Sequence, residues 1–77
     1  MKDRLEGKLI RIYKDLRYGF IKYNNTDYFF HKDDYLEDWN ALVLDFERNP
    51  PVLLEFRPDS TPKGLRARDV RFSPITV

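Results

Sequence analysis

Two neighbouring stretches of the chain carry the side chains whose types and spacing could bind a flat ligand. Residues 16–23 (Leu-Arg-Tyr-Gly-Phe-Ile-Lys-Tyr) and residues 27–31 (Asp-Tyr-Phe-Phe-His) are rich in aromatic rings. Between them stand Asn24 and Asn25, and asparagine tolerates the positive φ angles of a tight hairpin turn. The pattern predicts two short strands joined by that turn.

The predicted hairpin has two different faces, because successive side chains of a strand point to opposite sides. Ile21, Tyr28 and Phe30 share the face expected to enter a core. The other face carries three rings and the only histidine of the chain, a set that we call the aromatic platform: Tyr18, Phe20, Phe29 and His31. A soluble protein rarely exposes such a cluster without a partner. Flat rings beside basic side chains are suited to stacking on nucleobases and to attracting phosphates.

The sequence gives little support to a catalytic or metal-binding role for His31. The chain has no second histidine and no cysteine, and no carboxylate pair has metal-ligand spacing. The acidic cluster Asp33-Asp34 and Glu37-Asp38 favours a solvated loop with a helix cap over a metal site. We therefore expect no enzyme activity, no cofactor, no metal and no small-molecule substrate. Stacking or hydrogen bonding to a base is the favoured role of His31, and a solvated surface histidine is the alternative.

Length and charge limit the function classes further. The 77 residues suffice for one small domain. The chain has 14 basic and 13 acidic residues and a net charge of +1, which is too balanced for a protein that holds duplex DNA through many phosphates. Aromatic residues make up 16% of the chain and can supply both a core and a binding surface. The lack of cysteine, of a long apolar run and of an apolar N-terminal stretch predicts a cytoplasmic protein without a membrane partner.

Three further strands are expected outside the hairpin, at residues 7–13, 52–57 and 65–72. In the first of them neither face is purely apolar, which predicts a bulge or a bend. In the second, the side chains expected to face the core are Val52, Leu54 and Phe56. Residues 58–64 are dense in turn formers and are expected to be a loop. Residues 1–6 are expected to be frayed, and residues 73–77 to be a loose tail.

The stretch from residue 32 to residue 51 has the most ambiguous pattern. Apolar side chains recur there at helical spacing, at Tyr35, Leu36, Trp39, Leu42, Val43 and Phe46. The interval from Asp34 to Glu37 suits a helix cap. We favour a helical turn or a short helix near residues 34–40, between the third and fourth strands, followed by an irregular loop, with a short strand at residues 42–46 as the alternative. Asn49-Pro50-Pro51 should end whichever element precedes it.

Five short strands with a longer excursion between the third and the fourth predict an all-β fold. The expected architecture is a five-stranded antiparallel barrel of the oligonucleotide-binding type over residues 7–72. Such barrels bind ligands over their second and third strands and the neighbouring loops. The aromatic platform lies on those two strands, so the predicted fold and the predicted site agree.

The chain resembles the cold-shock domain family over nearly its whole length, from about residue 7 to residue 72. The family motif Lys-Gly-Phe/Tyr-Gly-Phe-Ile is matched by Leu-Arg-Tyr-Gly-Phe-Ile at residues 16–21. The motif Val-Phe-Val-His-Phe, or Tyr-Phe-Phe-His-Arg in some members, is matched by Tyr-Phe-Phe-His-Lys at residues 28–32. The last strands of the family are matched at residues 52–55 and 62–70. Departures are Arg11 where the family has tryptophan, Ile10 and Leu16 where it has lysine, and Lys32 where it has phenylalanine.

The resemblance implies a role for several side chains. It places base stacking on Tyr18, Phe20, Phe29 and His31, and it assigns a loop aromatic to Trp39, a basic loop residue to Lys63 and an acidic residue to Asp27. For Trp39, a core position at the end of the barrel is the alternative. The basic side chains that flank the platform, and that we expect to attract the nucleic-acid backbone, are Arg11, Lys22, Lys32 and Lys63.

These features predict a module that binds single-stranded RNA or DNA by stacking, with low sequence specificity. The resemblance implies an RNA-chaperone-like or gene-regulator-like role. The alternative is a protein-interaction module on the same barrel, motivated by the missing tryptophan, the near-neutral charge and the apolar residues 42–46. We expect a monomer, with a homodimer through that apolar segment as the alternative.

Overall fold

The hairpin at Asn24-Asn25 is confirmed by the computed structural model of the chain, which describes residues 4–73. Strand β2 (Tyr18–Tyr23) pairs antiparallel with β3 (Thr26–His31). Both asparagines have positive φ, 53° and 64°, as the tight turn requires. The core face is also as predicted, since Ile21 and Phe30 are fully buried and Tyr28 packs its ring 5.0 Å from that of Phe56.

The first strand is longer than expected and contains the predicted bulge. Strand β1 (Leu5–Tyr13) starts two residues earlier than the pattern indicated, so Leu5 and Glu6 belong to the barrel. Its register with β2 shifts between Leu9 and Arg11, which is the irregularity that the mixed alternation predicted. Of the rest of the expected frayed start, Arg4 contacts the carboxylate of Glu55 on β4, and residues 1–3 lie outside the described residues.

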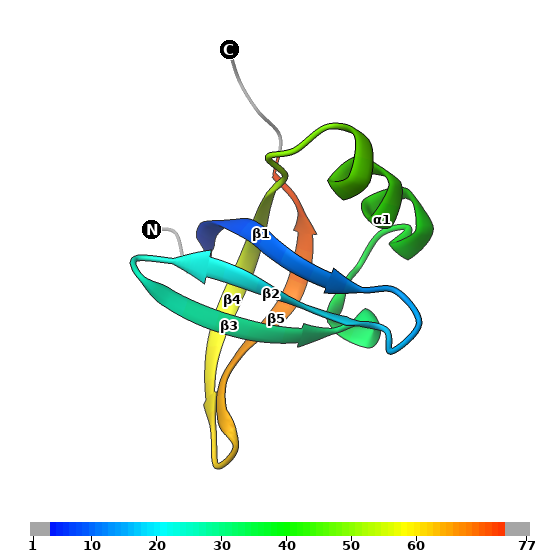
Figure 1. Cartoon of the computed structure of the whole chain (residues 1–77). Coiled ribbons are helices and arrows are strands. Elements are labelled where there is room, and N and C mark those ends of the chain that lie inside the picture. Colours follow the sequence, from blue (N-terminus) through cyan, green and yellow to red (C-terminus); the bar gives the residue numbers. More distant parts are fainter. Residues whose placement is uncertain (1–3, 74–77) are drawn as a thin grey trace.

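The prediction of a loop at residues 58–64 is wrong. Strand β4 (Leu53–Thr61) extends to residue 61 and strand β5 (Gly64–Phe72) begins at residue 64, so only two residues separate them. Their ladder runs from Leu54↔Phe72 to Thr61↔Gly64 and carries this hairpin beyond the barrel (Figure 1). Gly64, with a φ of 127°, allows the sharp reversal after Lys63. The turn-forming residues 58–61 therefore belong to a long β4–β5 hairpin, whose part beyond the barrel we call the β4–β5 arm.

The start of the predicted tail is ordered against the barrel. Ser73 is buried, and its backbone N–H donates a 3.0 Å hydrogen bond to the carbonyl of Leu53. The rest of that tail, residues 74–77, lies outside the described residues.

The five strands close into a barrel in the order β1-β2-β3-β5-β4, with β4 pairing back onto β1. The closed all-β barrel is as predicted, but its purely antiparallel character is wrong, because β3 and β5 run parallel at Phe29↔Arg66. A closed ring with an odd number of strands cannot alternate direction at every neighbour. At least one parallel pair is therefore unavoidable.

The barrel interior is filled by apolar side chains from all five strands and the helix. Its fully buried members include Leu9, Ile21, Phe30, Leu54, Phe56, Ala67 and Val70. Val52, Leu54 and Phe56 all face the core, as their alternation with polar neighbours predicted.

The helix lies later in the chain than expected. A 3₁₀ turn, η1 (Lys32–Asp34), follows β3, and helix α1 spans Trp39–Arg48. A short helix between the third and fourth strands is therefore confirmed, but its position near residues 34–40, the irregular loop after it and the alternative strand at residues 42–46 are wrong. The helix covers the end of the barrel away from the β4–β5 arm (Figure 1).

Local chemistry explains the bounds of α1. The carboxylate of Asp38 accepts hydrogen bonds from the backbone N–H groups of Asn40 (3.0 Å) and Ala41 (3.4 Å), which is an N-cap. The N–H of Asn49 donates to the carbonyl of Asp45, and Pro50 then ends the helix as predicted. No helix within residues 4–73 has the length and apolar character needed to cross a membrane.

The side chains on the inner face of α1 should contribute much of the stability of the protein. Trp39 is only 5% exposed and its ring lies 6.1 Å from that of Phe30, whereas Leu44 on the outer face is 45% exposed. We expect Trp39→Ala to lower the free energy of unfolding by about 3–5 kcal/mol, and Leu44→Ala to lower it by less than about 1 kcal/mol. Urea unfolding followed by circular dichroism measures both. Similar small losses in the two variants would contradict the buried position of Trp39.

Tyr35 should make stability fall at high pH. Burial, together with the nearby carboxylates of Glu37, Asp45 and Asp38, raises the pKa of Tyr35 from 10.0 to about 12. The unfolded chain therefore loses its phenolic proton first, so the contribution is complete below pH 10 and is lost between pH 10 and pH 12. We expect this residue to lower the free energy of unfolding by about 1 kcal/mol between pH 9 and pH 11. Urea midpoints of the wild type and Tyr35→Phe at both pH values measure it, and an equal decline in the two proteins would refute it.

Candidate functional site

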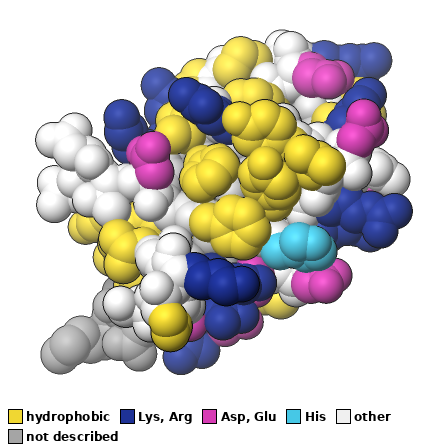
Figure 2. Space-filling view, turned by 60° about the horizontal axis from the view of Figure 1, so that its bottom comes forward, with side chains coloured by type: hydrophobic (Ala, Val, Ile, Leu, Met, Phe, Trp, Pro, Cys, Tyr) yellow, Lys and Arg dark blue, Asp and Glu magenta, His cyan; other side chains and the backbone are white. Residues whose placement is uncertain are grey.

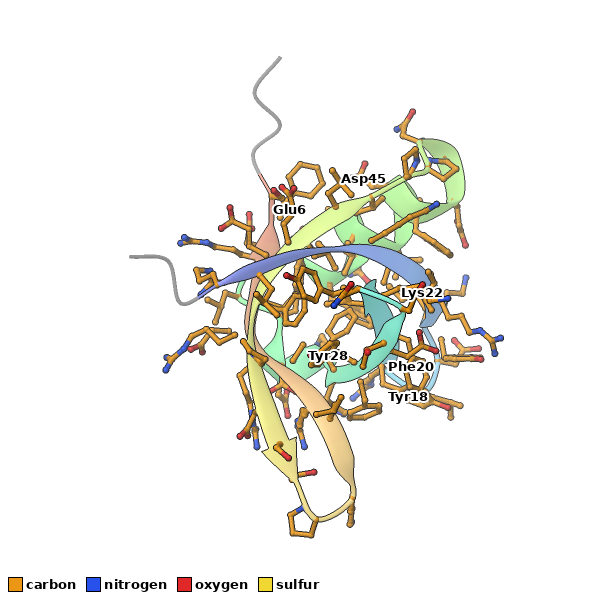
Figure 3. The ribbon with its side chains drawn as sticks, turned by 90° about the vertical axis from the view of Figure 1, so that its left-hand side faces the viewer. Glu6, Tyr18, Phe20, Lys22, Tyr28 and Asp45 are labelled. Atoms are coloured by element: carbon orange, nitrogen blue, oxygen red, sulfur yellow. The ribbon has the colours of Figure 1, made fainter. Side chains whose placement is uncertain are left out.

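The aromatic platform forms on one face of the β2–β3 hairpin. The register places Tyr18 opposite His31 and Phe20 opposite Phe29. The ring centroid of Phe29 lies 5.4 Å from that of Tyr18 and 5.8 Å from that of Phe20, and all four side chains are half-buried. Figure 2 shows hydrophobic side chains gathered at the centre of this face, with the single histidine at their edge. Figure 3 shows Tyr18 and Phe20 side by side.

Gly19 explains how β2 presents these rings. A Cβ atom at this position would lie 2.7 Å from the carbonyl oxygen of Arg11 and 3.0 Å from the ring of Phe30. Only glycine lets β2 lie this close to its neighbours in the core. The flanking Tyr18 and Phe20 then point to the outer face of the strand.

Tyr13 extends the platform and was missed by the sequence analysis. Its partly exposed ring lies 4.9 Å from that of Tyr18, because the two residues face each other in the β1–β2 ladder. Its hydroxyl lies 3.5 Å from Nη1 of Arg11, and this hydrogen bond raises the pKa of Arg11. Correct pairing of the first two strands would have identified it, but the bulge obscures that register.

Arg66 is the second residue that the sequence analysis missed. Its guanidinium carbon lies 5.5 Å from the ring centroid of Phe29, within the range of a cation–π contact. The parallel pairing of β3 and β5 sets the two residues side by side. The sequence alone does not single out Arg66, because that pairing has no local signature.

Asp34 connects the platform to β5. Its carboxylate is nearly buried, and Oδ2 lies 3.0 Å from Nε and 2.9 Å from Nη2 of Arg66. The same oxygen accepts a 3.0 Å hydrogen bond from the backbone N–H of His31. Oδ1 lies 3.5 Å from Nη1 of Arg68. One carboxylate therefore joins the end of β3, the turn η1 and the outer face of β5.

His31 has a defined local partner and is not simply solvated. Its Nδ1 accepts a 3.0 Å hydrogen bond from the backbone N–H of Asp33, which caps η1. In the neutral ring the proton is then carried by Nε2, which is available as a donor. The cap orients the imidazole at the edge of the platform, beside Tyr18.

The basic residues predicted to attract a backbone lie around the platform and not in one cluster. Arg11 is the β1 neighbour of Phe20, and Lys22 faces Asp27 across the hairpin. Lys32 follows His31 in η1, and Lys63 lies at the tip of the β4–β5 arm. The structure therefore surrounds the rings with single charges, and Asp27 offsets one of them.

Trp39 does not join the platform. The resemblance implies a stacking role for it, but its indole is buried against Phe30, so the alternative of a core position is the one observed. Trp39 also lines a groove of about 620 Å³ between the β1–β2 loop and α1, where Lys14, Arg17 and Lys32 lie with Asp15 and Glu47. A groove with charges of both signs thus borders the platform on the side of His31.

A second depression borders the platform on the side of the β4–β5 arm. It has a volume of about 610 Å³, and we call it the arm pocket. Its lining residues are Phe20, Phe29, Thr61, Pro62, Lys63, Gly64, Leu65, Arg66 and Arg68. Two platform rings form one wall and the arm forms the other, so a flat group could enter between them.

Comparisons with known proteins give no identification: no protein-family model matches the chain, and no curated protein is found as a relative. Within residues 4–73 no group of three or more His, Cys, Asp or Glu side chains could hold a metal ion. The arrangement of the side chains themselves is therefore the basis for assigning a function.

Asp34 should contribute more to stability than its exposed neighbour. Its side chain is 9% exposed and that of Asp33 is 88% exposed. Asp34→Ala leaves Arg66 and the His31 N–H without their acceptor, and because both arginines stay partly hydrated we expect a loss of about 1–3 kcal/mol. Asp33→Ala is the matched control and should change the free energy of unfolding by less than about 0.5 kcal/mol. Urea unfolding compares them, and equal losses would contradict the role of Asp34.

Proposed function

We propose that this protein binds single-stranded nucleic acid by stacking bases on the aromatic platform. The observation that carries the proposal is the contiguous set of rings on β2 and β3, with centroid separations of 5.4 to 6.0 Å and cationic side chains on each side. Base–aromatic stacking is worth about 1–3 kcal/mol per base. Two or three such contacts suffice for useful affinity without a strongly basic surface.

Single strands fit this surface better than a duplex does. A duplex hides the faces of its bases and presents phosphates, for which a protein needs many cations. This chain has a net charge of +1, and several of its arginines are already paired with carboxylates. Binding should therefore depend mainly on exposed bases, with a moderate dependence on salt.

The fold is consistent with the proposal. The closed order β1-β2-β3-β5-β4 agrees with the oligonucleotide-binding barrel, in which ligands lie over the second and third strands. We further propose that the chain is a divergent cold-shock-like domain, on the basis of its two aromatic motifs and its last strand. An RNA-chaperone-like or gene-regulator-like role would follow from that assignment.

The protein-interaction hypothesis has lost one of the three features that motivated it, the apolar loop, whereas the missing tryptophan and the near-neutral charge remain. Residues 42–46 were expected to form an apolar loop, but they lie within α1. Leu42 and Val43 face the core, and Phe46 packs partly against it. Leu44 alone of the apolar side chains in this segment is exposed, and single exposed apolar side chains are common on any protein surface.

The test is the affinity of short labelled oligonucleotides for the wild type, for Phe20→Ala and Phe29→Ala separately, and for the double variant. Fluorescence anisotropy with heptathymidine and heptauridine at low and moderate salt gives the dissociation constants. Each single substitution should weaken binding by roughly 5-fold to 100-fold, because each removes one stacking surface. The double variant should approach the detection limit.

Phe72→Ala is the matched control, since this partly exposed ring at the end of β5 lines neither the groove beside α1 nor the arm pocket. It should bind like the wild type. Circular dichroism and urea midpoints establish that the Phe20 and Phe29 variants still fold. Unchanged affinity in the folded double variant, or no binding by the wild type at low salt, would refute the proposed function.

A further inference from the structure

The arm pocket differs from a flat stacking surface because it has two walls. Phe20 and Phe29 lie on the barrel side, and Pro62 and Leu65 lie on the arm side. The arm exists because β4 and β5 remain paired up to Thr61↔Gly64. A base that entered here would lie between the platform rings and the arm, close to the guanidinium of Arg66, which lies over the ring of Phe29.

Arg66 lies in this pocket in a fixed orientation. Two of its nitrogens, Nε and Nη2, are held side-on by Oδ2 of Asp34 at 3.0 and 2.9 Å. A guanidinium has five N–H donors in a rigid plane. The contact with Asp34 uses Nε–H and one hydrogen of Nη2, so the two hydrogens of Nη1 and the second hydrogen of Nη2 remain. Within residues 4–73 these have no acceptor at hydrogen-bond distance.

The charges around Arg66 are already balanced. Asp34 contacts both Arg66 and Arg68, and Asp59 holds Nε of Arg68 at 3.1 Å. Two guanidinium groups are thus matched by two carboxylates. A phosphate would gain little net attraction from these two arginines and would also have to lie against apolar side chains, and Lys63 at the tip of the arm is the cation of the pocket left to attract the backbone. A neutral group with acceptor atoms along one edge fits better.

Guanine is the base that presents such an edge. Its O6 and N7 are adjacent acceptors, and arginine contacts them with two parallel N–H donors. Adenine places a donor group beside N7, cytosine presents a donor, and thymine presents a single acceptor on the corresponding edge. The free N–H donors on Nη1 and Nη2 of Arg66 can therefore discriminate among bases by hydrogen bonding, which the rings of the platform cannot do.

We propose that the arm pocket is a guanine-selecting subsite in which Arg66, positioned by Asp34, reads the O6 and N7 atoms of one base. This inference rests on the proposed function and adds a base preference to it. The platform binds neighbouring bases without selection, and the arm pocket sets the register of the strand.

The experiment compares heptathymidine with seven heptamers that each carry one guanine, at successive positions, and with the matching adenine series. Dissociation constants are measured by anisotropy at one fixed salt concentration. For the wild type we expect the best guanine heptamer to bind at least about fivefold more tightly than heptathymidine or any adenine heptamer. Replacing that guanine by 7-deazaguanine, which lacks the N7 acceptor, should remove most of the gain without any change to the protein.

Arg66→Lys tests the residue itself, because it keeps the charge but loses the planar fork. It should show no guanine preference, so that its best guanine heptamer binds no more tightly than heptathymidine binds to the same variant. Arg71→Lys is the matched control: Arg71 lies on the same strand, pairs with Glu55 at 3.2 Å and does not line the pocket. It should retain the preference.

The outcomes separate this inference from the proposed function. Binding of all heptamers without a guanine preference, a preference that survives in Arg66→Lys, or one that is insensitive to 7-deazaguanine overturns the arm-pocket assignment and leaves the stacking function standing. Equal weakening of every heptamer by Arg66→Lys means a backbone contact and also overturns it. If no heptamer binds to the wild type, both proposals fail. The 7-deazaguanine comparison decides the matter even if Arg66→Lys does not fold.

Discussion

Closure of a barrel from five strands is the constraint on which the rest of this structure depends. Neighbouring strands cannot all be antiparallel in a ring with an odd number of members, so one pair must be parallel, and here it joins β3 and β5. That pair brings Arg66 beside Phe29, although the two residues are far apart in the sequence. The aromatic platform, which belongs to one local hairpin, thereby acquires a cationic neighbour from the last strand. The candidate site is a consequence of barrel closure as much as of the motif residues.

Asp34 stabilises this junction chemically. A nearly buried carboxylate requires hydrogen-bond donors, and it finds them in the backbone of His31 and in the guanidinium groups of β5. The same contacts orient the edge of the platform and hold Arg66 in one position. Interactions that keep the fold together and interactions that prepare the binding surface are therefore shared at this residue. Such sharing lets a small domain present a rigid site, because each ordered side chain serves both purposes.

The helix and the arm divide the remaining surface between them. Helix α1 closes one end of the barrel with Trp39, Leu42 and Val43, and so converts an apolar stretch into core. The β4–β5 arm extends from the opposite end and forms the second wall of the arm pocket (Figure 1). The rings of the platform lie between these two elements. A single strand that crossed them would meet a groove with charges of both signs on one side and the arm pocket on the other.

Local sequence patterns determined the hairpin, its turn and the identity of its two faces. Alternation along a strand assigns Phe30 to the core and Phe29 to the surface without knowledge of any other element, because the period of two is a property of the extended backbone. Turn formation at Asn24 and Asn25 is equally local. The sequence also indicated the bulge in β1 and the end of the helix at Pro50, since each depends on residues within a few positions.

Only the tertiary structure decided which distant residues meet. Trp39 became a core residue because α1 begins at the cap of Asp38, while Asp34, the other candidate cap, is occupied by His31 and Arg66. Residues 58–61 became strand because β5 offers them a partner, which outweighs their turn-forming composition. The neighbours Tyr13 and Arg66 depend on strand pairings that leave no trace in local spacing. Side-chain alternation is set by the backbone of one strand, whereas pairing between strands is set by closure of the whole barrel.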